Sequence, residues 1–176
     1  AMVGHIGTAH NLAAMPVQFE KNVMNFFPIT AAREMYEPFH KLKYSFAATY
    51  FDQMRNAVPK IAKEKGAKKV CTMHQDDEFG KEVLRGAEVG LKTIGMEFVD
   101  FSSQVARMQA AGCDMIVLGT IIRETIGAIG TARKLGYNPI FLGSSAAYTD
   151  LIHKLGGPAM NGFYATGTVQ NPYLDD

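Results

Sequence analysis

The sequence predicts an α/β protein in three layers, a parallel β-sheet with helices on both faces. Between residues 68 and 143, short apolar runs alternate with longer amphipathic stretches, which is the pattern of parallel βαβ units. Glycines stand where the predicted helices should end, at Gly66, Gly95, Gly112 and Gly136, because glycine readily takes the left-handed conformation that closes a helix. Such sheets bind ligands beyond the carboxyl ends of their strands, so function is expected there.

The first part of the chain is less regular. Apolar runs predict strands at residues 2–4 and 23–27, with a helix between them that begins near Leu12. The stretch from 31 to 44 is charged and aromatic, and Pro38 breaks any long helix within it.

Regular alternation begins after Thr49. Asp100 and Thr120 are the expected N-caps of two of the helices. The predicted strands cover residues 69–73, 96–99, 115–118, 139–142 and 163–166, and the predicted helices end near residues 66, 95, 112, 136 and 155.

Composition excludes some classes of function. A net charge of +1 with scattered basic residues gives no electrostatic reason to expect nucleic acid. No stretch approaches the roughly 20 apolar residues of a transmembrane span, so direct membrane insertion is not expected. Cys71 falls inside a predicted strand and Cys113 just before one. We expect two unpaired core thiols, which neither support nor exclude an oxidising compartment.

Two loops could carry chemistry. Gly4-x-x-Gly7-Thr8 follows a strand and opens a helix, so its backbone N–H groups and the Thr8 hydroxyl could hold a small carboxylate or phosphate; an ordinary tight turn is the alternative. Residues 74–80 contain a histidine and three acids. Acids at a helix start complement its dipole, so we expect no metal there and look instead to Phe79, which is placed to overhang the crevice.

No catalytic set is predicted. Ser144 and Ser145 lack the Gly-x-Ser-x-Gly elbow of hydrolases, and no nucleophile, base and orienting acid come together in the sequence. We therefore expect a binding protein and not an enzyme, and no cofactor.

Several stretches of the sequence resemble one and the same protein family. They are residues 3–11, 27–31, 69–80, 100–107, 114–119, 132–136 and 141–143. In order and spacing they resemble type I periplasmic solute-binding proteins of ABC transporters, in the leucine/isoleucine/valine-binding family. The chain departs from the family pattern at one point, because Val99 runs directly into Asp100 where members carry a further loop.

The resemblance implies two flavodoxin-like α/β lobes that are joined by crossing strands and close on a small molecule. It implies that this chain is an incomplete two-lobe protein. Residues 1–46 would be the end of the first-lobe segment, residues 47–166 the second lobe, and residues 167–176 a crossover back towards the first lobe.

The resemblance also implies a ligand site. Its first-lobe positions are Gly7, Thr8, Ala9, Ile29, Thr30 and Ala31, which would grip a ligand carboxylate, and its second-lobe positions are Phe79, Ile121 and Ser145. Amino-acid-binding members have an acidic residue at the place of Ser145, and serine cannot neutralise an ammonium. Apolar and aromatic neighbours therefore favour an aromatic or hydrophobic organic acid.

The implied partners are that small carboxylate and a membrane permease of an ABC transporter, and the implied location is periplasmic or extracytoplasmic. Two alternatives remain open: a ligand-sensing domain of a receptor or regulator with the same fold, and a flavodoxin-like or Rossmann-like enzyme. The enzyme would need a cofactor signature or a catalytic set.

Overall fold

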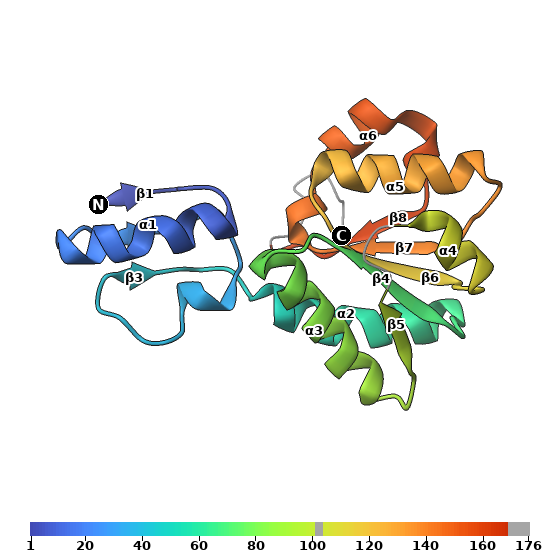
Figure 1. Cartoon of the computed structure of the whole chain (residues 1–176), viewed down its shortest axis with the longest axis horizontal. Coiled ribbons are helices and arrows are strands. Elements are labelled where there is room, and N and C mark those ends of the chain that lie inside the picture. The colour runs from blue at the N-terminus through green and yellow to red at the C-terminus, as the bar shows by residue number, and fades with distance from the viewer. Residues whose placement is uncertain (101–103, 169–176) are drawn as a thin grey trace, which may run out of the picture.

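A computed structural model describes residues 1–100 and 104–168, and shows two α/β units side by side (Figure 1). The predicted motif at 101–103 and most of the predicted crossover at 167–176 lie outside the described residues. The elements, with η for a 3-10 helix, are β1 (Met2–Val3), α1 (Thr8–Glu20), β2 (Asn25–Phe26), η1 (Arg33–Met35), β3 (Lys43–Tyr44), α2 (Tyr50–Lys65), β4 (Val70–His74), α3 (Glu78–Lys92), β5 (Phe98–Asp100), α4 (Val105–Ala110), β6 (Met115–Gly119), α5 (Ile122–Lys134), β7 (Ile140–Gly143), η2 (Ser145–Ala147), α6 (Leu151–Gly156), η3 (Gly157–Met160) and β8 (Phe163–Ala165).

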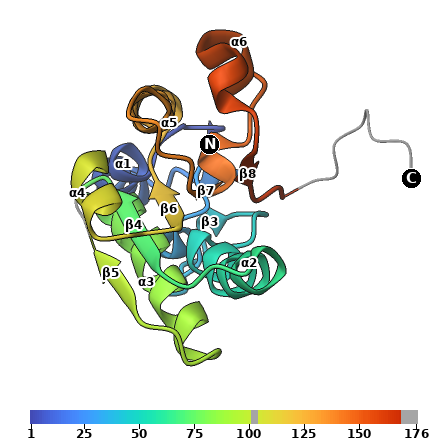
Figure 2. The ribbon, with the colours of Figure 1, turned by 90° about the vertical axis from the view of Figure 1, so that its right-hand side faces the viewer.

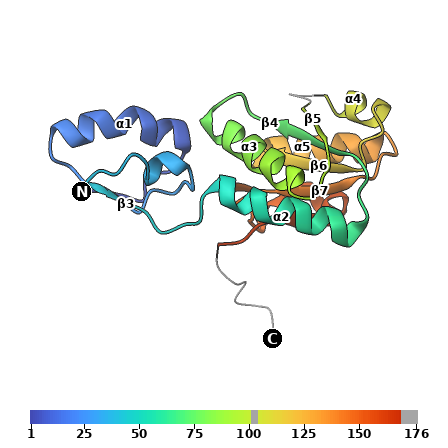
Figure 3. The same ribbon diagram turned by 90° about the horizontal axis from the view of Figure 1, so that it is seen from below.

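Each unit has its own sheet. The small unit, β1 to β3 with α1 and η1, has a three-stranded sheet of order β1-β2-β3. The large unit, α2 to β8, has a five-stranded sheet of order β5-β4-β6-β7-β8. Every strand pair in both sheets is parallel, as predicted. The chain passes from β3 to α2 between the units, as the view from below shows (Figure 3).

The large sheet has helices on both faces (Figure 2). Met115 and Val117 of β6 belong to a core shared with α2 and α3, whereas Ile116 and Leu118 pack with α4, α5 and α6. Successive side chains of a strand point to opposite faces, so one apolar run on β6 serves both cores. The predicted three layers are confirmed.

Only some of the helix caps agree with the sequence-based predictions. Thr49 caps α2 by accepting the Asp52 backbone N–H at 3.0 Å. The predicted N-caps Asp100 and Thr120 are wrong. Asp100 is the last residue of β5, and the Thr120 hydroxyl pairs with that of Thr125 at 2.8 Å instead of capping α5.

The N-terminal elements also differ from prediction. Helix α1 begins at Thr8 and not near Leu12. It starts this early because Gly7, its N-cap, takes a φ of 99° that other residues rarely adopt. Strand β3 lies within the stretch where no element was predicted.

The two cysteines form a disulfide, so the expectation of free thiols is wrong. Cys71 of β4 is bonded to Cys113, which precedes β6. The two strands are neighbours in the large sheet, and both cysteines are buried on the face covered by α4 and α5. The bond closes a 42-residue separation in sequence.

We expect the double variant Cys71→Ala/Cys113→Ala to lose about 2–4 kcal/mol of unfolding free energy, because a cross-link restricts the unfolded chain. Urea denaturation of the oxidised protein measures the loss. Adding a reductant should lower the stability of the wild type and leave the variant unchanged; equal sensitivity of both would contradict the disulfide.

Two glycines in helices make a matched pair for testing the packing of α2 on α3. A Cβ at Gly86 of α3 would lie 2.5 Å from the Phe51 carbonyl oxygen of α2, whereas a Cβ at Gly127 of α5 would meet nothing within 4 Å. We expect Gly86→Ala to destabilise the protein by about 1–3 kcal/mol through overpacking. Gly127→Ala should stabilise it by about 0.5–1 kcal/mol through helix propensity. Thermal unfolding distinguishes the two, and equal effects would contradict this packing.

Candidate functional site

Two of the predicted ligand-binding residues meet directly at the junction of the units. The hydroxyl oxygens of Thr8, at the start of α1, and Thr30, after β2, lie 2.7 Å apart. Both residues are only 6% exposed. Thr30 Oγ1 also accepts the Ala32 backbone N–H at 3.2 Å. The structure thus brings together two hydroxyls that are 22 residues apart in sequence.

The neighbouring loop backbone is held by internal hydrogen bonds. Gly7 N–H donates to the Ile29 carbonyl at 3.2 Å. The Asn11 side-chain amide donates to the carbonyls of His5 and Gly7 at 2.7 and 2.8 Å. Ala9 and Ile29 are exposed. The Gly7 N–H therefore holds the two loops together, beside the hydrogen-bonded hydroxyls of Thr8 and Thr30.

A tyrosine that sequence reasoning missed connects this region to Phe79. Tyr50, the first residue of α2, donates its backbone N–H to the Ala31 carbonyl at 2.9 Å. Its ring packs edge-to-face on Phe79 with centroids 4.8 Å apart. Phe79 is 5% exposed, so it does not overhang the crevice as expected; its contact with a ligand stays a prediction. Burial is the main cause that raises the pKa of Tyr50.

Gln53 is a second residue that the sequence did not single out. Its side-chain oxygen accepts the Ser145 backbone N–H at 3.0 Å and the Thr166 hydroxyl at 2.7 Å. Its amide donates to the Ala48 carbonyl at 2.8 Å. Gln53 thus fixes the position of Ser145 at the carboxyl end of β7. Ile121 lies apart at the start of α5, with 46% of its surface exposed.

Glu82 of α3 is a buried carboxylate at the same junction, 5% exposed. It accepts the Arg33 backbone N–H at 3.1 Å, and the Arg33 guanidinium lies 3.7 Å from its other oxygen. Burial raises the pKa of Glu82 to about 7, against the opposing effect of Arg33. In the sequence Glu82 lies among helical residues and has no signal that marks it as buried.

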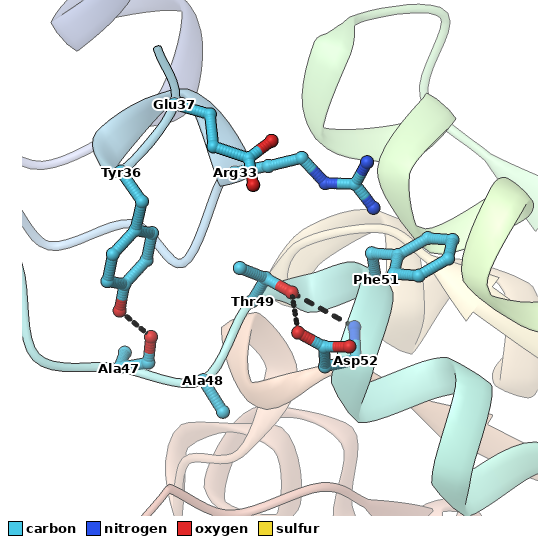
Figure 4. Close-up of a pocket in the computed structure, with 8 residues that line it drawn as sticks. All are labelled: Arg33, Tyr36, Glu37, Ala47, Ala48, Thr49, Phe51 and Asp52. Atoms are coloured by element: carbon cyan, nitrogen blue, oxygen red, sulfur yellow. Dashed lines mark hydrogen bonds between the residues drawn. The ribbon is translucent and has the colours of Figure 1, made fainter. Parts of the chain in front are cut away.

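A cleft of about 590 Å³ opens beside this pair (Figure 4). Arg33 reaches across it towards Phe51, while the Tyr36 hydroxyl bonds the Ala47 carbonyl on the opposite wall. The residues that line it are Arg33, Tyr36, Glu37, Ala47, Ala48, Thr49, Phe51 and Asp52. The nine predicted ligand-binding residues do not line this cleft, which follows the segment that joins the units.

Residues 1–100 and 104–168 contain no group of three or more histidine, cysteine or acidic side chains placed to hold a metal ion. Within the same ranges, no helix is long and apolar enough to cross a membrane.

Comparison with known proteins identifies the family. The family model for the periplasmic binding protein matches residues 1–176, the whole chain. The chain belongs to the periplasmic binding protein family. This confirms two expectations from the sequence: the resemblance to type I periplasmic solute-binding proteins of the leucine/isoleucine/valine-binding family, and the parallel α/β fold.

Relatives of the chain in this family are distant. The Leu/Ile/Val/Thr-binding protein of Salmonella typhimurium is 21% identical over 175 residues, which cover 94% of this chain and 48% of the relative. The chain therefore spans about half the length of the curated relatives it matches.

Solved structures of the family share the fold. A possible leucine/isoleucine/valine-binding protein from Rhodopirellula baltica superposes with a TM-score of 0.86 at 19% identity, covering 97% of this chain and 50% of that one. A fatty acid ABC transporter substrate-binding protein from Thermomonospora curvata gives a TM-score of 0.78 at 20% identity, covering 91% and 44%.

The role of Gln53 in holding Ser145 is testable. We expect Gln53→Leu to cost about 1–3 kcal/mol of unfolding free energy, because the half-buried Ser145 backbone N–H loses its acceptor. Amide hydrogen exchange at Ser145 should accelerate. Asn56→Leu, at an exposed position of the same helix, is the matched control and should change neither quantity; equal effects would show that Gln53 is an ordinary helix residue.

Proposed function

We propose that this chain is part of an extracytoplasmic solute receptor of an ABC transporter, which binds a small carboxylate between two lobes. The small unit would belong to one lobe and the large unit to the other. The observation that carries the proposal is the buried Thr8–Thr30 hydroxyl pair at the junction of the units.

The hydroxyl pair suits a carboxylate for a chemical reason. Each hydroxyl has one donor proton, and in this structure the Thr8 and Thr30 hydroxyls are hydrogen-bonded to each other. A carboxylate placed between them accepts a hydrogen bond from both, and a hydrogen bond to a charged acceptor is stronger than a neutral one. Thr8 also opens α1, and a helix N-terminus favours negative charge.

The second side of the site supports an organic acid without an α-ammonium group. Ser145 is neutral, and Ile121 offers exposed apolar surface. An ammonium buried here without a counter-charge would be costly, whereas the apolar end of an acid would gain from burial. A family member named for fatty acid transport is consistent with such a ligand, although other relatives are named for branched-chain amino acids.

Family membership also supports the wider role. Periplasmic binding proteins that serve ABC transporters deliver their ligand to a membrane permease, and we propose the same partner for the whole protein. The Cys71–Cys113 disulfide supports an oxidising, extracytoplasmic location. Ligand would favour the closed form through its higher affinity for that form.

Isothermal titration of the intact protein tests the ligand class. We expect 3-phenylpropanoate or benzoate to bind and leucine to bind at least tenfold more weakly, since leucine brings an unpaired ammonium. Thr8→Val should weaken binding of the acid by about tenfold or more, because it removes one hydrogen bond to a charged group. Thr131→Val, at an exposed position of α5, is the control and should bind normally. A preference for leucine would overturn the ligand class, and normal binding by Thr8→Val would overturn the site.

A further inference from the structure

Tyr50 contacts predicted ligand-binding residues of both units. It is the first residue of α2 and follows the segment that joins the units. Its backbone N–H donates to the Ala31 carbonyl of the small unit at 2.9 Å, and its ring packs edge-to-face on Phe79 of the large unit with the centroids 4.8 Å apart. All three residues belong to one buried apolar cluster. The position of Tyr50 is therefore fixed by two members of the predicted site, one from each unit.

The hydroxyl of Tyr50 lies beside the Thr8–Thr30 pair. Burial raises the pKa of Tyr50, and hydrogen bonding by the Ala31 backbone and the Thr30 side chain opposes that rise. The Tyr50 hydroxyl is thus within reach of Thr30, whose own hydroxyl lies 2.7 Å from that of Thr8. Each of the three residues is only 6% exposed. Hydroxyls from α2, from the loop after β2 and from the start of α1 therefore form one group.

This group of three hydroxyls has more donors than it can use internally. Three hydroxyls carry three protons, and the contacts of Thr30 with Thr8 and with Tyr50 use at most two of them. Thr30 Oγ1 also accepts the Ala32 backbone N–H at 3.2 Å, which occupies an acceptor and adds no proton to spare. At least one hydroxyl proton is therefore left for an acceptor outside the group.

The negative charges near Tyr50 have donors of their own. Glu82 and Asp77 both act on Tyr50 through their charge. Glu82 accepts the Arg33 backbone N–H at 3.1 Å and lies 3.7 Å from the Arg33 guanidinium. Asp77 caps α3 by accepting the Gly80 backbone N–H at 2.8 Å. Neither carboxylate needs the hydroxyl protons.

We propose that Tyr50 is a ligand-binding residue, the third hydroxyl donor to the ligand carboxylate, and that it sets a preference for carboxylates over carboxamides. The inference rests on the proposed function and extends the carboxylate grip to a residue of the large unit. A carboxylate has two acceptor oxygens with about four lone pairs, so it accepts from Thr8, Thr30 and Tyr50 together. A carboxamide has one acceptor oxygen, and its NH₂ brings two more donors to a group that already has a surplus.

Calorimetric titration of the intact protein with 3-phenylpropanoate, and displacement of that acid by 3-phenylpropanamide, tests the role of Tyr50. Tyr50→Phe removes the hydroxyl but keeps the ring against Phe79 and the backbone N–H to Ala31. We expect this variant to bind the acid about tenfold or more weakly, since a hydrogen bond to a charged group is lost. Binding of the amide should weaken by less than about threefold, because a neutral hydrogen bond contributes less.

A matched control and a second measurement separate contact from support of the fold. Tyr44→Phe, on β3 where Tyr44 is 45% exposed, removes the same phenol oxygen and should leave both affinities unchanged. In otherwise unaltered protein, 3-fluorotyrosine in place of Tyr50 should show a shifted ¹⁹F signal when the acid saturates the site. The same label in place of Tyr44 should not respond. This measurement keeps the ring and the hydroxyl, so it does not depend on the stability of Tyr50→Phe.

Equal weakening of the acid and the amide in Tyr50→Phe would show that Tyr50 only supports the fold, and would overturn the inference. Unchanged binding of the acid by that variant, or an unmoved ¹⁹F signal at saturation, would overturn it while the proposed function stands. If the wild type binds no organic acid, the proposed function fails and this inference fails with it.

Discussion

The close packing of α3 against α2 is the contact on which the rest of the structure depends. Gly86 and Gly90 of α3 lie against the backbone of α2. A Cβ at Gly86 would lie 2.5 Å from the Phe51 carbonyl oxygen, and a Cβ at Gly90 would lie 2.6 Å from that of Arg55. Neither site has room for a side chain. The missing side chains let the two backbones approach more closely than larger residues would allow. This approach fixes how the first turns of both helices face the small unit.

Several side chains at the junction of the units are positioned by this helix pair. Tyr50 and Gln53 lie in the first turn of α2, and Phe79 and Glu82 lie near the start of α3. Tyr50 reaches the loop after β2 and packs on Phe79, Gln53 holds η2, and Glu82 reaches η1. A shift between the two helices would therefore disturb the junction of the units and the carboxyl end of β7 together.

The sequence was sufficient to predict the large sheet because its central strands β6 and β7 are buried almost throughout and read as unbroken apolar runs. Strand β3 was missed because Lys43 and Tyr44 form only two residues of strand and show no alternation. The disulfide was missed because it depends on the pairing of β4 with β6, which periodicity does not specify. Thr8 was named from the Gly4-x-x-Gly7-Thr8 loop, and Thr30 through the family resemblance. Glu82 was not named, because its burial depends on contact with η1, which is far from it in the sequence.

The junction contains polar groups that are paired before any ligand arrives, and this pairing shapes what the proposed site can accept. A buried polar group without a partner costs about 1–3 kcal/mol. The Thr8 and Thr30 hydroxyls share one hydrogen bond, so in the proposed complex a carboxylate would replace that neutral bond with two charge-assisted ones. An ammonium could donate to a hydroxyl oxygen, but a neutral hydroxyl supplies no counter-charge. Ser145 is neutral, and the buried carboxylate of Glu82 already accepts the N–H of Arg33, which an ammonium would have to displace. The proposed preference for an acid over an amino acid therefore rests on the hydrogen bonds of the ligand-free protein.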